Sequence, residues 1–418
     1  MFDKLRTLLA PALIAGTALT AVPAAAADQE IRIGVISVLE GAFAALGQDG
    51  IRGAELAVRE VGGTVAGRPV KLITMSSDAS PDSAVNGARK LIEQDKVDLI
   101  VGPLSGSEGI ALRDFSKANP GTTFLNGSSA AQDTTLREGS SNFFRFGGDG
   151  AQWMAGLGRY AFNDMGYKKV VTVAEDYSFP YTQVLGFMLE YCQAGGRVPN
   201  KFWVPIGNKD YSSIVYAIPD DVDAIYVALG GADAVNFLTQ YHQAGGGKPI
   251  IGGTITIDQS ILDSKGPFRK LLIGAPAGTP TVSNYDGAEW KAFADAYRAA
   301  FPDGFSSPTI FAHHYYMSAK AALLALATVD GRLDDGQKAF RAALAKTTFV
   351  TPTGGTMRLD ENRNGIIDSF LTKVVENADG TLGNSVIKVV RDVDQTLGVP
   401  RDKFLAMGPV SRDNPSCP

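Results

Sequence analysis

Cysteine and histidine are scarce in this chain of 418 residues, which carries only two cysteines and three histidines. Neither cysteine belongs to a CxxC pair, and the adjacent His313 and His314 would point in different directions from a helix. We therefore expect no metal site. Cys192 and Cys417 leave two alternatives open: a disulfide that fixes the C-terminal tail in an oxidising compartment, or two free thiols.

Motifs of common enzymes and nucleotide sites are also missing. The chain has no GxSxG, no HExxH, no GxGxxG after a strand and no Gly-Lys-Ser/Thr phosphate loop. The segment 360–365, DENRNG, begins like a calcium loop, but its twelfth position is Leu371 where glutamate is required, so we predict a hairpin turn. No pair of carboxylates is placed for acid–base chemistry. We therefore expect neither a cofactor nor an enzyme.

An excess of positive charge is absent, and so are long apolar runs beyond the N-terminus. The formal net charge of −5 and the lack of a basic stripe argue against nucleic-acid binding. Residues 1–27 combine a basic start, an apolar stretch (Leu8–Val22) too short for a membrane anchor, and Ala25-Ala26-Ala27 before Asp28. This is the pattern of a cleaved signal peptide. We therefore expect a periplasmic protein that does not insert into the membrane.

What the chain does contain is a regular alternation of strand-like and helix-like segments. Strands expected at 31–36 and 70–75 alternate with helices expected at 49–61 and 81–94, and the rhythm restarts after Gly148. This pattern predicts an α/β fold with two lobes, each a parallel sheet covered by helices on both faces. Because no flexible linker separates the two sets, we expect the lobes to meet at a hinge beside a cleft.

Two of the expected strands end in small, hydroxyl-rich loops that lead into helices. The segment 97–109 reads VDLIVGPLSGSEG, and the segment 122–129 reads TTFLNGSS. The carboxyl ends of parallel strands share one edge of a sheet, where hydroxyls and helix N–H groups favour an anion. We therefore expect a binding site for a small carboxylate, although serines in such loops also serve as helix caps.

The order of these motifs resembles that of the solute-binding proteins of ABC importers in the leucine/isoleucine/valine-binding family, also called type I periplasmic binding proteins. The resemblance includes VDLIVGPLSGSEG, AEDYSFPY, KDYSSIV and VDAIYVALGGADAVNFL, and it covers residues 30–376. It implies two Rossmann-like lobes with parallel sheets, joined by a hinge of three crossings near Gly148, Ala275 and Pro352. The implied division is a signal peptide at 1–27, lobe one at 28–148 plus 276–350, lobe two at 149–275 plus 351–390, and a C-terminal strap at 391–418.

The resemblance also implies which residues hold the ligand. In the family, two loops of lobe one bind the ligand carboxylate, apolar side chains line its body, and lobe two supplies an aromatic wall. The corresponding residues here are Ser105, Gly106, Ser107, Ser128, Ser129 and Ala130 in the loops, Leu46 and Leu104 in the lining, and Tyr177 and Phe179 in the wall. Gly106 stands where the family usually has a hydroxyl, so Ser105, Ser107 or the backbone would have to replace it.

Thr254 is a second departure from the family. Amino-acid binders have a glutamate at this place, which pairs with the ammonium group of the ligand. A buried ammonium without such a partner costs on the order of several kcal/mol. Either another acid reaches the ligand or the ligand has no ammonium, and we favour the second alternative. The acids that could replace the glutamate are Glu40, Glu175, Asp176 and Asp233.

These inferences together predict the periplasmic solute-binding component of an ABC uptake transporter. The protein would capture a branched-chain or other amino acid, or an aromatic or aliphatic organic acid, in the cleft between its lobes. It would act as a monomer and deliver this ligand to an inner-membrane permease. A periplasmic ligand sensor on the same fold is the first alternative, and an α/β hydrolase is a less favoured one.

Overall fold

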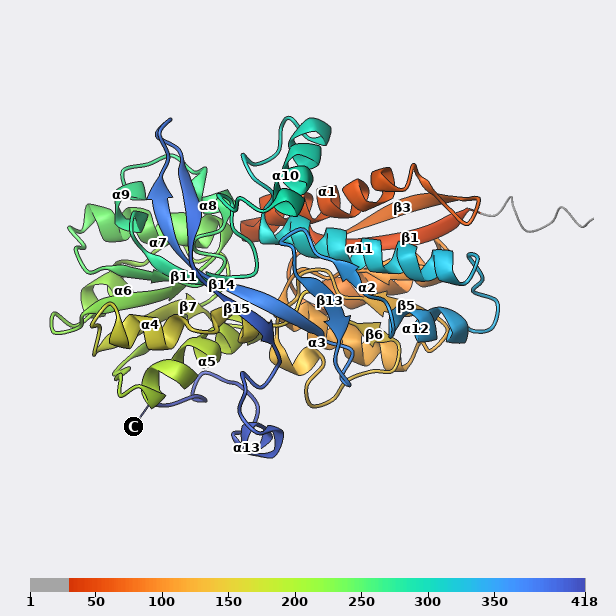
Figure 1. Ribbon diagram of the computed structural model, residues 1–418. Helices are drawn as coiled ribbons and strands as arrows, with labels where there is room; N and C mark the ends of the chain where they lie inside the picture. Colours follow the sequence, from red (N-terminus) through yellow and green to blue (C-terminus); the bar gives the residue numbers. More distant parts are fainter. Residues whose placement is uncertain (1–29, 418) are drawn as a thin grey trace, which may run out of the picture.

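The computed structural model describes residues 30–417, so the predicted signal peptide lies outside the described residues. This part of the chain forms two α/β lobes, which lie side by side in Figure 1. The first sheet has the strand order β2-β3-β1-β4-β5-β6, and its pairs are parallel except for β2 with β3. Its elements are β1 (Ile31–Val38), β2 (Thr64–Val65), β3 (Arg68–Ser77), β4 (Leu99–Val101), β5 (Thr123–Leu125) and β6 (Phe143–Phe144), with helices η1 (Gly41–Phe43), α1 (Ala44–Glu60), α2 (Pro81–Glu93), α3 (Gly106–Lys117) and η2 (Gln132–Thr134).

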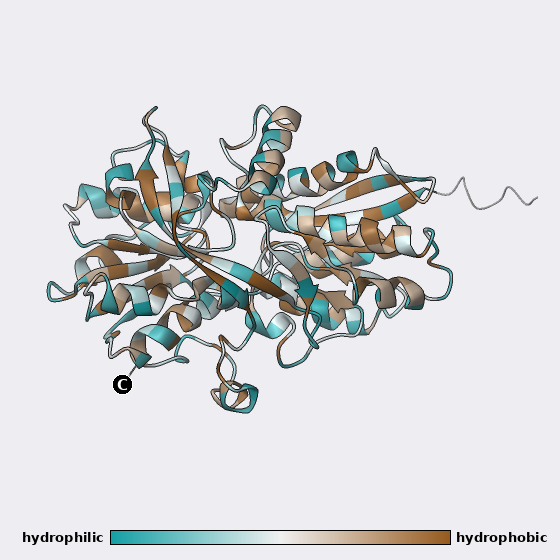
Figure 2. Cartoon of the chain, in the orientation of Figure 1, coloured by the Kyte–Doolittle hydropathy of each residue, from teal (hydrophilic) through white to brown (hydrophobic). Residues whose placement is uncertain are grey.

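Strand β1 explains why this sheet lies between two layers of helices. Ile33 and Val35 pack in the core shared with α1, whereas Ile36 packs on the opposite face with Leu91 of α2 and Leu112 of α3. A strand that is buried on both faces is typical of a parallel sheet covered by helices. Figure 2 shows the same arrangement as brown strands between helices of mixed colour. The predicted α/β fold with helices on both faces is confirmed.

The second sheet has the order β12-β13-β14-β11-β10-β9-β7-β8, with β15 paired to β14. The pairs from β7 to β11 are parallel, whereas β14 runs antiparallel to its partners β11, β13 and β15. The strands are β7 (Val170–Glu175), β8 (Lys201–Val204), β9 (Ala224–Ala228), β10 (Ile250–Gly252), β11 (Pro276–Thr279), β12 (Phe349–Val350), β13 (Thr356–Leu359), β14 (Gly365–Glu376) and β15 (Leu382–Val393). The remaining helices are η3 (Gln152–Met154), α4 (Leu157–Asn163), α5 (Ser178–Gln193), α6 (Ser212–Ala217), α7 (Gly231–Gln243), α8 (Gln259–Leu262), α9 (Arg269–Leu272), α10 (Ala288–Ala300), α11 (Ile310–Thr328), α12 (Lys338–Leu344) and α13 (Arg401–Ala406).

Two of the expected lobe boundaries need correction. Strand β11 pairs with β10 and β14, so it belongs to the second sheet, although we expected lobe one to resume at residue 276. Its sequence, Pro-Ala-Gly-Thr, lacks the β-branched run that would have marked it as a strand. Strand β15 continues to Val393, so the tail starts after this residue and not at 391.

The predicted hairpin at 360–365 is confirmed, because it joins the antiparallel strands β13 and β14. The Oδ1 atom of Asp360 accepts hydrogen bonds from the backbone N–H groups of Asn362 at 2.8 Å and Asn364 at 2.9 Å. The residue with positive φ is Arg363, at 61°, and not one of the asparagines or the glycine. The carboxylate therefore closes a turn, as Asp side chains commonly do.

A buried arginine joins the first crossing between the lobes to this hairpin. The guanidinium of Arg145 donates hydrogen bonds of 2.6 Å to Asn364 Oδ1, to the backbone oxygen of Ala131 and to Thr135 Oγ1. It lies 3.7 Å from the carboxylate of Asp149. Burial lowers the pKa of Arg145 to about 10, which leaves the side chain charged at neutral pH. A polar network therefore fixes the segment where the chain passes from one lobe to the other.

A disulfide attaches the C-terminal tail to lobe two. Cys192 of α5 and Cys417 form a disulfide, so the structure favours the first of the two alternatives for these cysteines.

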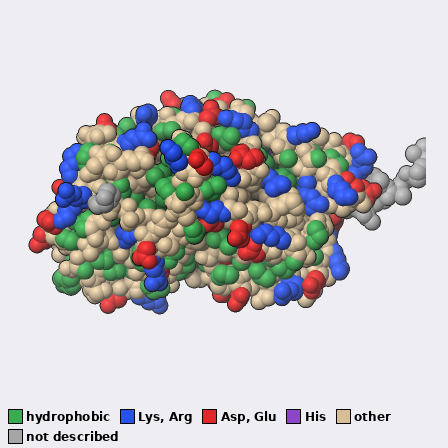
Figure 3. All heavy atoms as spheres, turned by 90° about the horizontal axis from the view of Figure 1, so that it is seen from below, with side chains coloured by type: hydrophobic (Ala, Val, Ile, Leu, Met, Phe, Trp, Pro, Cys, Tyr) green, Lys and Arg blue, Asp and Glu red, His purple; other side chains and the backbone are tan. Residues whose placement is uncertain are grey.

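In the described part of the chain, no helix is long and apolar enough to cross a membrane. Figure 3 shows Lys and Arg side chains interspersed with Asp and Glu over the face seen from below.

Candidate ligand-binding site

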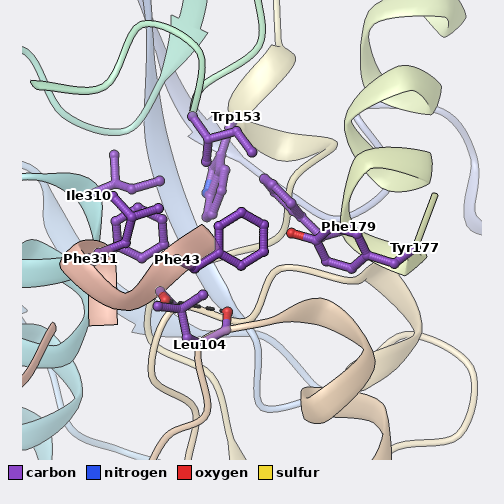
Figure 4. Close-up of a pocket in the computed structure, with 10 residues that line it drawn as sticks. Phe43, Leu104, Trp153, Tyr177, Phe179, Ile310 and Phe311 are labelled. Atoms are coloured by element: carbon purple, nitrogen blue, oxygen red, sulfur yellow. Dashed lines mark hydrogen bonds between the residues drawn. The ribbon is translucent and has the colours of Figure 1, made fainter. Parts of the chain in front are cut away.

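A small cavity lies where the two lobes meet. Lobe one supplies η1, the start of α1, the loops after β4 and β5, and the N-terminus of α11. Lobe two supplies η3, the start of α5 and the loop after β10. Figure 4 shows how these elements surround the cavity. Its lining consists of Phe43, Leu46, Leu104, Ser128, Trp153, Tyr177, Phe179, Ile255, Ile310 and Phe311.

Aromatic rings form a continuous side of this cavity. The ring centroid of Tyr177 lies 6.3 Å from that of Phe43 and 6.1 Å from that of Phe179. Trp153 lies edge-to-face with Phe179 at 5.7 Å, and its indole N–H donates a 3.0 Å hydrogen bond to the backbone oxygen of Gly147. The indole N–H is thus already bonded, and Trp153 presents its apolar surface to the cavity.

Two of the lining side chains carry hydroxyl groups, Ser128 and Tyr177. Burial, and to a smaller degree the nearby carboxyl groups of Glu175, Glu108 and Asp233, raise the pKa of Tyr177 well above its usual value. The phenol therefore stays protonated and can donate a hydrogen bond, and Figure 4 shows its oxygen directed toward the middle of the cavity. The hydroxyl of Ser128 makes only a long contact of 3.5 Å with the backbone oxygen of Leu104, so it is also able to donate to a ligand.

Five of the residues expected from the sequence meet at this cavity: Leu46, Leu104, Ser128, Tyr177 and Phe179. Ser105, which was also expected to bind the ligand, does not line it. Its hydroxyl donates to the backbone oxygen of Ala79 at 3.0 Å and accepts from the N–H of Glu108 at 3.3 Å. Glu108 in turn accepts from the N–H of Ser105, which completes a capping box at the start of α3. Ser105 is therefore a helix cap here.

Gly106 and Ser107 lie where the two lobes touch, outside the lining of the cavity. The hydroxyl of Ser107 is 3.2 Å from that of Ser178 in the first turn of α5. A Cβ atom at position 106 would lie 2.8 Å from both the Cβ and the backbone nitrogen of Phe179, closer than side chains pack. The missing side chain thus allows α5 to approach α3. This contact gives a physical reason for glycine where a hydroxyl was expected.

Ser129, Ala130 and Thr254 do not line the cavity either, and each contacts another part of the protein. The Ser129 side chain packs against Gly109 of α3, where an added Cβ would lie 1.9 Å from its oxygen, and the backbone oxygen of Ala130 accepts a 2.9 Å bond from Gly150. The Thr254 hydroxyl donates to the backbone oxygen of Gly278 at 2.7 Å and accepts from Gln183 at 2.7 Å. The neighbouring Ile255 faces the cavity in place of Thr254.

Comparison with known proteins agrees with this two-lobed geometry. The profile of the family described as Periplasmic binding protein matches residues 30–381. This chain belongs to the periplasmic binding protein family. The expected membership in its leucine/isoleucine/valine-binding branch is supported by the Leu/Ile/Val-binding protein homolog 3 of Brucella melitensis, which is 28% identical over 234 residues. That match covers 55% of this chain and 62% of the relative, so the chain spans only part of the relative's length.

Solved structures show the same periplasmic binding protein fold. The ABC transporter substrate-binding protein from Sphaerobacter thermophilus is 29% identical, with a TM-score of 0.78, and the match covers 88% of this chain and 99% of that one. An ABC-transporter solute-binding protein from R. palustris, solved in complex with benzoate, is 24% identical, also with a TM-score of 0.78. That match covers 87% of this chain and 98% of the neighbour.

None of the four acids considered for an ammonium group lines the cavity of this periplasmic binding protein. Glu40 accepts from Ser76 at 3.2 Å. Glu175 and Asp233 accept from the backbone N–H groups of Gly230 and Gly207, at 2.7 and 2.8 Å, and Asp176 forms an ion pair with Arg412. Among residues 30–417, no charged side chain lines the cavity. An ammonium group there would therefore have no carboxylate partner.

Half of the lining was missed in the sequence: Phe43, Trp153, Ile255, Ile310 and Phe311. Phe43 follows the carboxyl end of β1, so the rule that placed the serine loops at a sheet edge could also have found it. Trp153 comes directly after the first crossing between the lobes. Ile310 and Phe311 begin a long buried helix, and nothing in their local sequence distinguishes them from its core residues.

Proposed function

We propose that this periplasmic binding protein captures a small organic acid that has an aromatic or similarly flat apolar body and no ammonium group. The observation that carries the proposal is the lining of the cavity, which combines aromatic and aliphatic side chains with two hydroxyls and no charged group among the described residues. An amino acid would bury its ammonium there without a partner, at a cost of roughly several kcal/mol. Burial of a ring between apolar walls, in contrast, is favourable.

The acid group of the ligand would receive its hydrogen bonds from hydroxyl donors. The backbone N–H groups of Ser128 and Ser129 donate to the backbone oxygen of Pro103 at 3.0 and 3.2 Å, so they are already bonded. The hydroxyls of Ser128 and Tyr177 are the side-chain donors left in the lining, and hydrogen bonds to a charged acceptor are stronger than neutral ones. The benzoate found in the R. palustris neighbour is a ligand of this class.

The proposed role is binding and delivery without chemistry. Closure around the ligand requires contacts with both lobes, and the cavity draws its lining from both. A closed complex could then be recognised by a membrane permease of an ABC importer, after export of the protein to the periplasm. A hydrolase on this fold would need a nucleophile beside a base, and the lining offers no such pair among the described residues.

Calorimetry tests the ligand class. Purified protein without the predicted signal peptide is titrated with benzoate, 4-hydroxybenzoate, leucine and isoleucine, after unfolding and refolding to remove any co-purified ligand. We expect the aromatic acids to bind and to raise the melting temperature, since a ligand at 100 times its Kd stabilises the folded state by about 2.7 kcal/mol. Tighter binding of leucine or isoleucine than of either aromatic acid would overturn the proposal.

A further inference from the structure

The C-terminal segment 394–417, called the strap here, touches both lobes. Figure 1 shows it in dark blue beneath the molecule, running past α13 toward the lower end of α5. Phe404 of α13 is fully buried in an apolar cluster with Leu136 of lobe one and Leu185 of α5. Arg137 of lobe one donates a 2.6 Å hydrogen bond to the backbone oxygen of Gly408. The strap is therefore packed into the place where α5 meets lobe one.

The end of the strap is attached to both ends of α5. Cys417 is bonded to Cys192 in the last turn of this helix. Arg412 forms a two-pronged ion pair with Asp176, just before the helix: its Nε atom lies 2.7 Å from Oδ1, and its Nη2 atom contacts Oδ2. Between these points, Lys201 donates to the backbone oxygens of Asp413 at 2.9 Å and Pro415 at 2.7 Å.

Asp176 is the residue directly before the aromatic side of the cavity. Tyr177 and Phe179, which follow it, line the cavity, and Tyr177 caps α5 without a side-chain hydrogen bond of its own. The carboxylate of Asp176 also accepts from the hydroxyl of Tyr181, one turn further along α5. The ion pair with Arg412 thus contacts the turn from which the rings of Tyr177 and Phe179 extend into the cavity.

We infer that Arg412 is a positioning residue for ligand binding, through which the strap fixes the turn 176–179 and its aromatic rings. The inference rests on the proposed function only in that the ligand lies against those rings. The side chain of Arg412 is 63% exposed and that of Asp176 is 15% exposed, so water screens the pair from the side of the arginine and its contribution to global stability should be small. Loss of the pair should therefore change the mobility of one turn and the residence of the ligand, while the protein stays folded.

The test compares Arg412→Ala, Arg412→Lys and a control, Lys403→Ala, which alters an exposed side chain of the same strap. With benzoate as probe, stopped-flow measurement should show that Arg412→Ala raises the dissociation rate about three- to tenfold and leaves the association rate within twofold. Arg412→Lys should recover part of this loss, because an ammonium retains the charge but not the paired geometry. The control should match the wild type, and the melting temperature without ligand should not change.

Hydrogen–deuterium exchange without ligand provides a readout that does not depend on the proposed function. Amides of residues 176–182 should exchange at least threefold faster in Arg412→Ala, whereas those of β9 should keep the wild-type rate. If the wild type does not bind benzoate, the proposed ligand class is wrong. The exchange result alone then decides the role of Arg412. If Arg412→Ala leaves the exchange of 176–182 unchanged, or if Lys403→Ala has the same effect, the inference is wrong.

Discussion

Replacement of Gly106 by alanine should weaken ligand binding and leave the lobes folded. The added Cβ would lie 2.8 Å from the Cβ and the backbone nitrogen of Phe179 and 3.0 Å from the hydroxyl oxygen of Ser178. All three of these atoms belong to the first two residues of α5, and the two atoms of Phe179 cannot give way without moving the aromatic side of the cavity. The clash exists only when the two lobes are in contact, so it opposes closure.

The size of the effect follows from ordinary packing costs. Forcing an extra methyl group into a close-packed contact costs about 1–3 kcal/mol, which corresponds to a loss of affinity of roughly 5- to 150-fold. Gly106 is the first residue of α3, and its φ lies outside the positive region. Alanine there should therefore leave the stability of the ligand-free protein unchanged or raise it by up to about 1 kcal/mol. Affinity should thus fall without any loss of stability.

Calorimetry with benzoate gives the affinity, and urea unfolding without ligand gives the stability. Gly121→Ala serves as a control, because a Cβ at that position would meet no atom within 4 Å. X-ray scattering of the ligand-bound variant should show a larger radius of gyration than that of the wild type. Unchanged affinity of Gly106→Ala would refute the idea that this glycine permits closure, and a matching loss of stability would show a defect within lobe one instead.

Three further predictions concern single side chains. Ser128→Ala should raise the Kd for benzoate about tenfold by removing one hydrogen bond, whereas Ser129→Ala, whose hydroxyl faces Gly109, should leave it unchanged; equal effects in calorimetry would contradict the assigned lining. Arg145→Met should lower the free energy of unfolding in urea by about 3–5 kcal/mol, because it leaves Asp149 buried without its cation, and a loss below 1 kcal/mol would contradict this. Burial lowers the pKa of His313 to about 3. Between this value and about pH 6.5, the unfolded state therefore binds a proton that the folded state does not bind. The free energy of unfolding should consequently decrease as the pH falls from 6.5 toward 3. His313→Phe should reduce the pH slope of the unfolding free energy there by about 1.4 kcal/mol per pH unit, and identical slopes would show that His313 does not contribute.

The fold could be predicted from the sequence because its signals are local. Strand β1 is an apolar run, α2 begins with a Ser80 cap that accepts from Ser83, and the alternation of such elements leaves few α/β arrangements. Strand β11 was not predicted because it is short and consists mostly of small residues. Only its pairing with β10 and β14 identifies it as a strand. The lobe boundaries were wrong at the points where long-range pairing, and not local sequence, decides.

The ligand site was predicted only in part, and the reason lies in the serine loops. Ser105 and Ser128 follow neighbouring strands in similar sequences, yet one caps α3 and the other lines the cavity. The same residue type serves both purposes, and the difference depends on which backbone groups lie within reach. The aromatic residues Phe43 and Trp153 come from segments that no binding motif marks, and only the approach of the two lobes makes them neighbours of one ligand.

The two departures from the amino-acid binders, Gly106 and Thr254, converge in the structure on the helix α5. Gly106 leaves room for Phe179 at the start of this helix, and Thr254 accepts a hydrogen bond from Gln183 one turn later. In the family pattern these positions serve the carboxylate and the ammonium of an amino acid. Here both contribute to the seating of α5, whose rings close the cavity. Thr254 does not line the cavity, and its hydroxyl is bonded to Gly278 and Gln183, so it does not take the place of a glutamate there. Both departures therefore accord with the proposed ligand, a flat acid without an ammonium group, because Gly106 and Thr254 contribute to the position of the aromatic residues of α5.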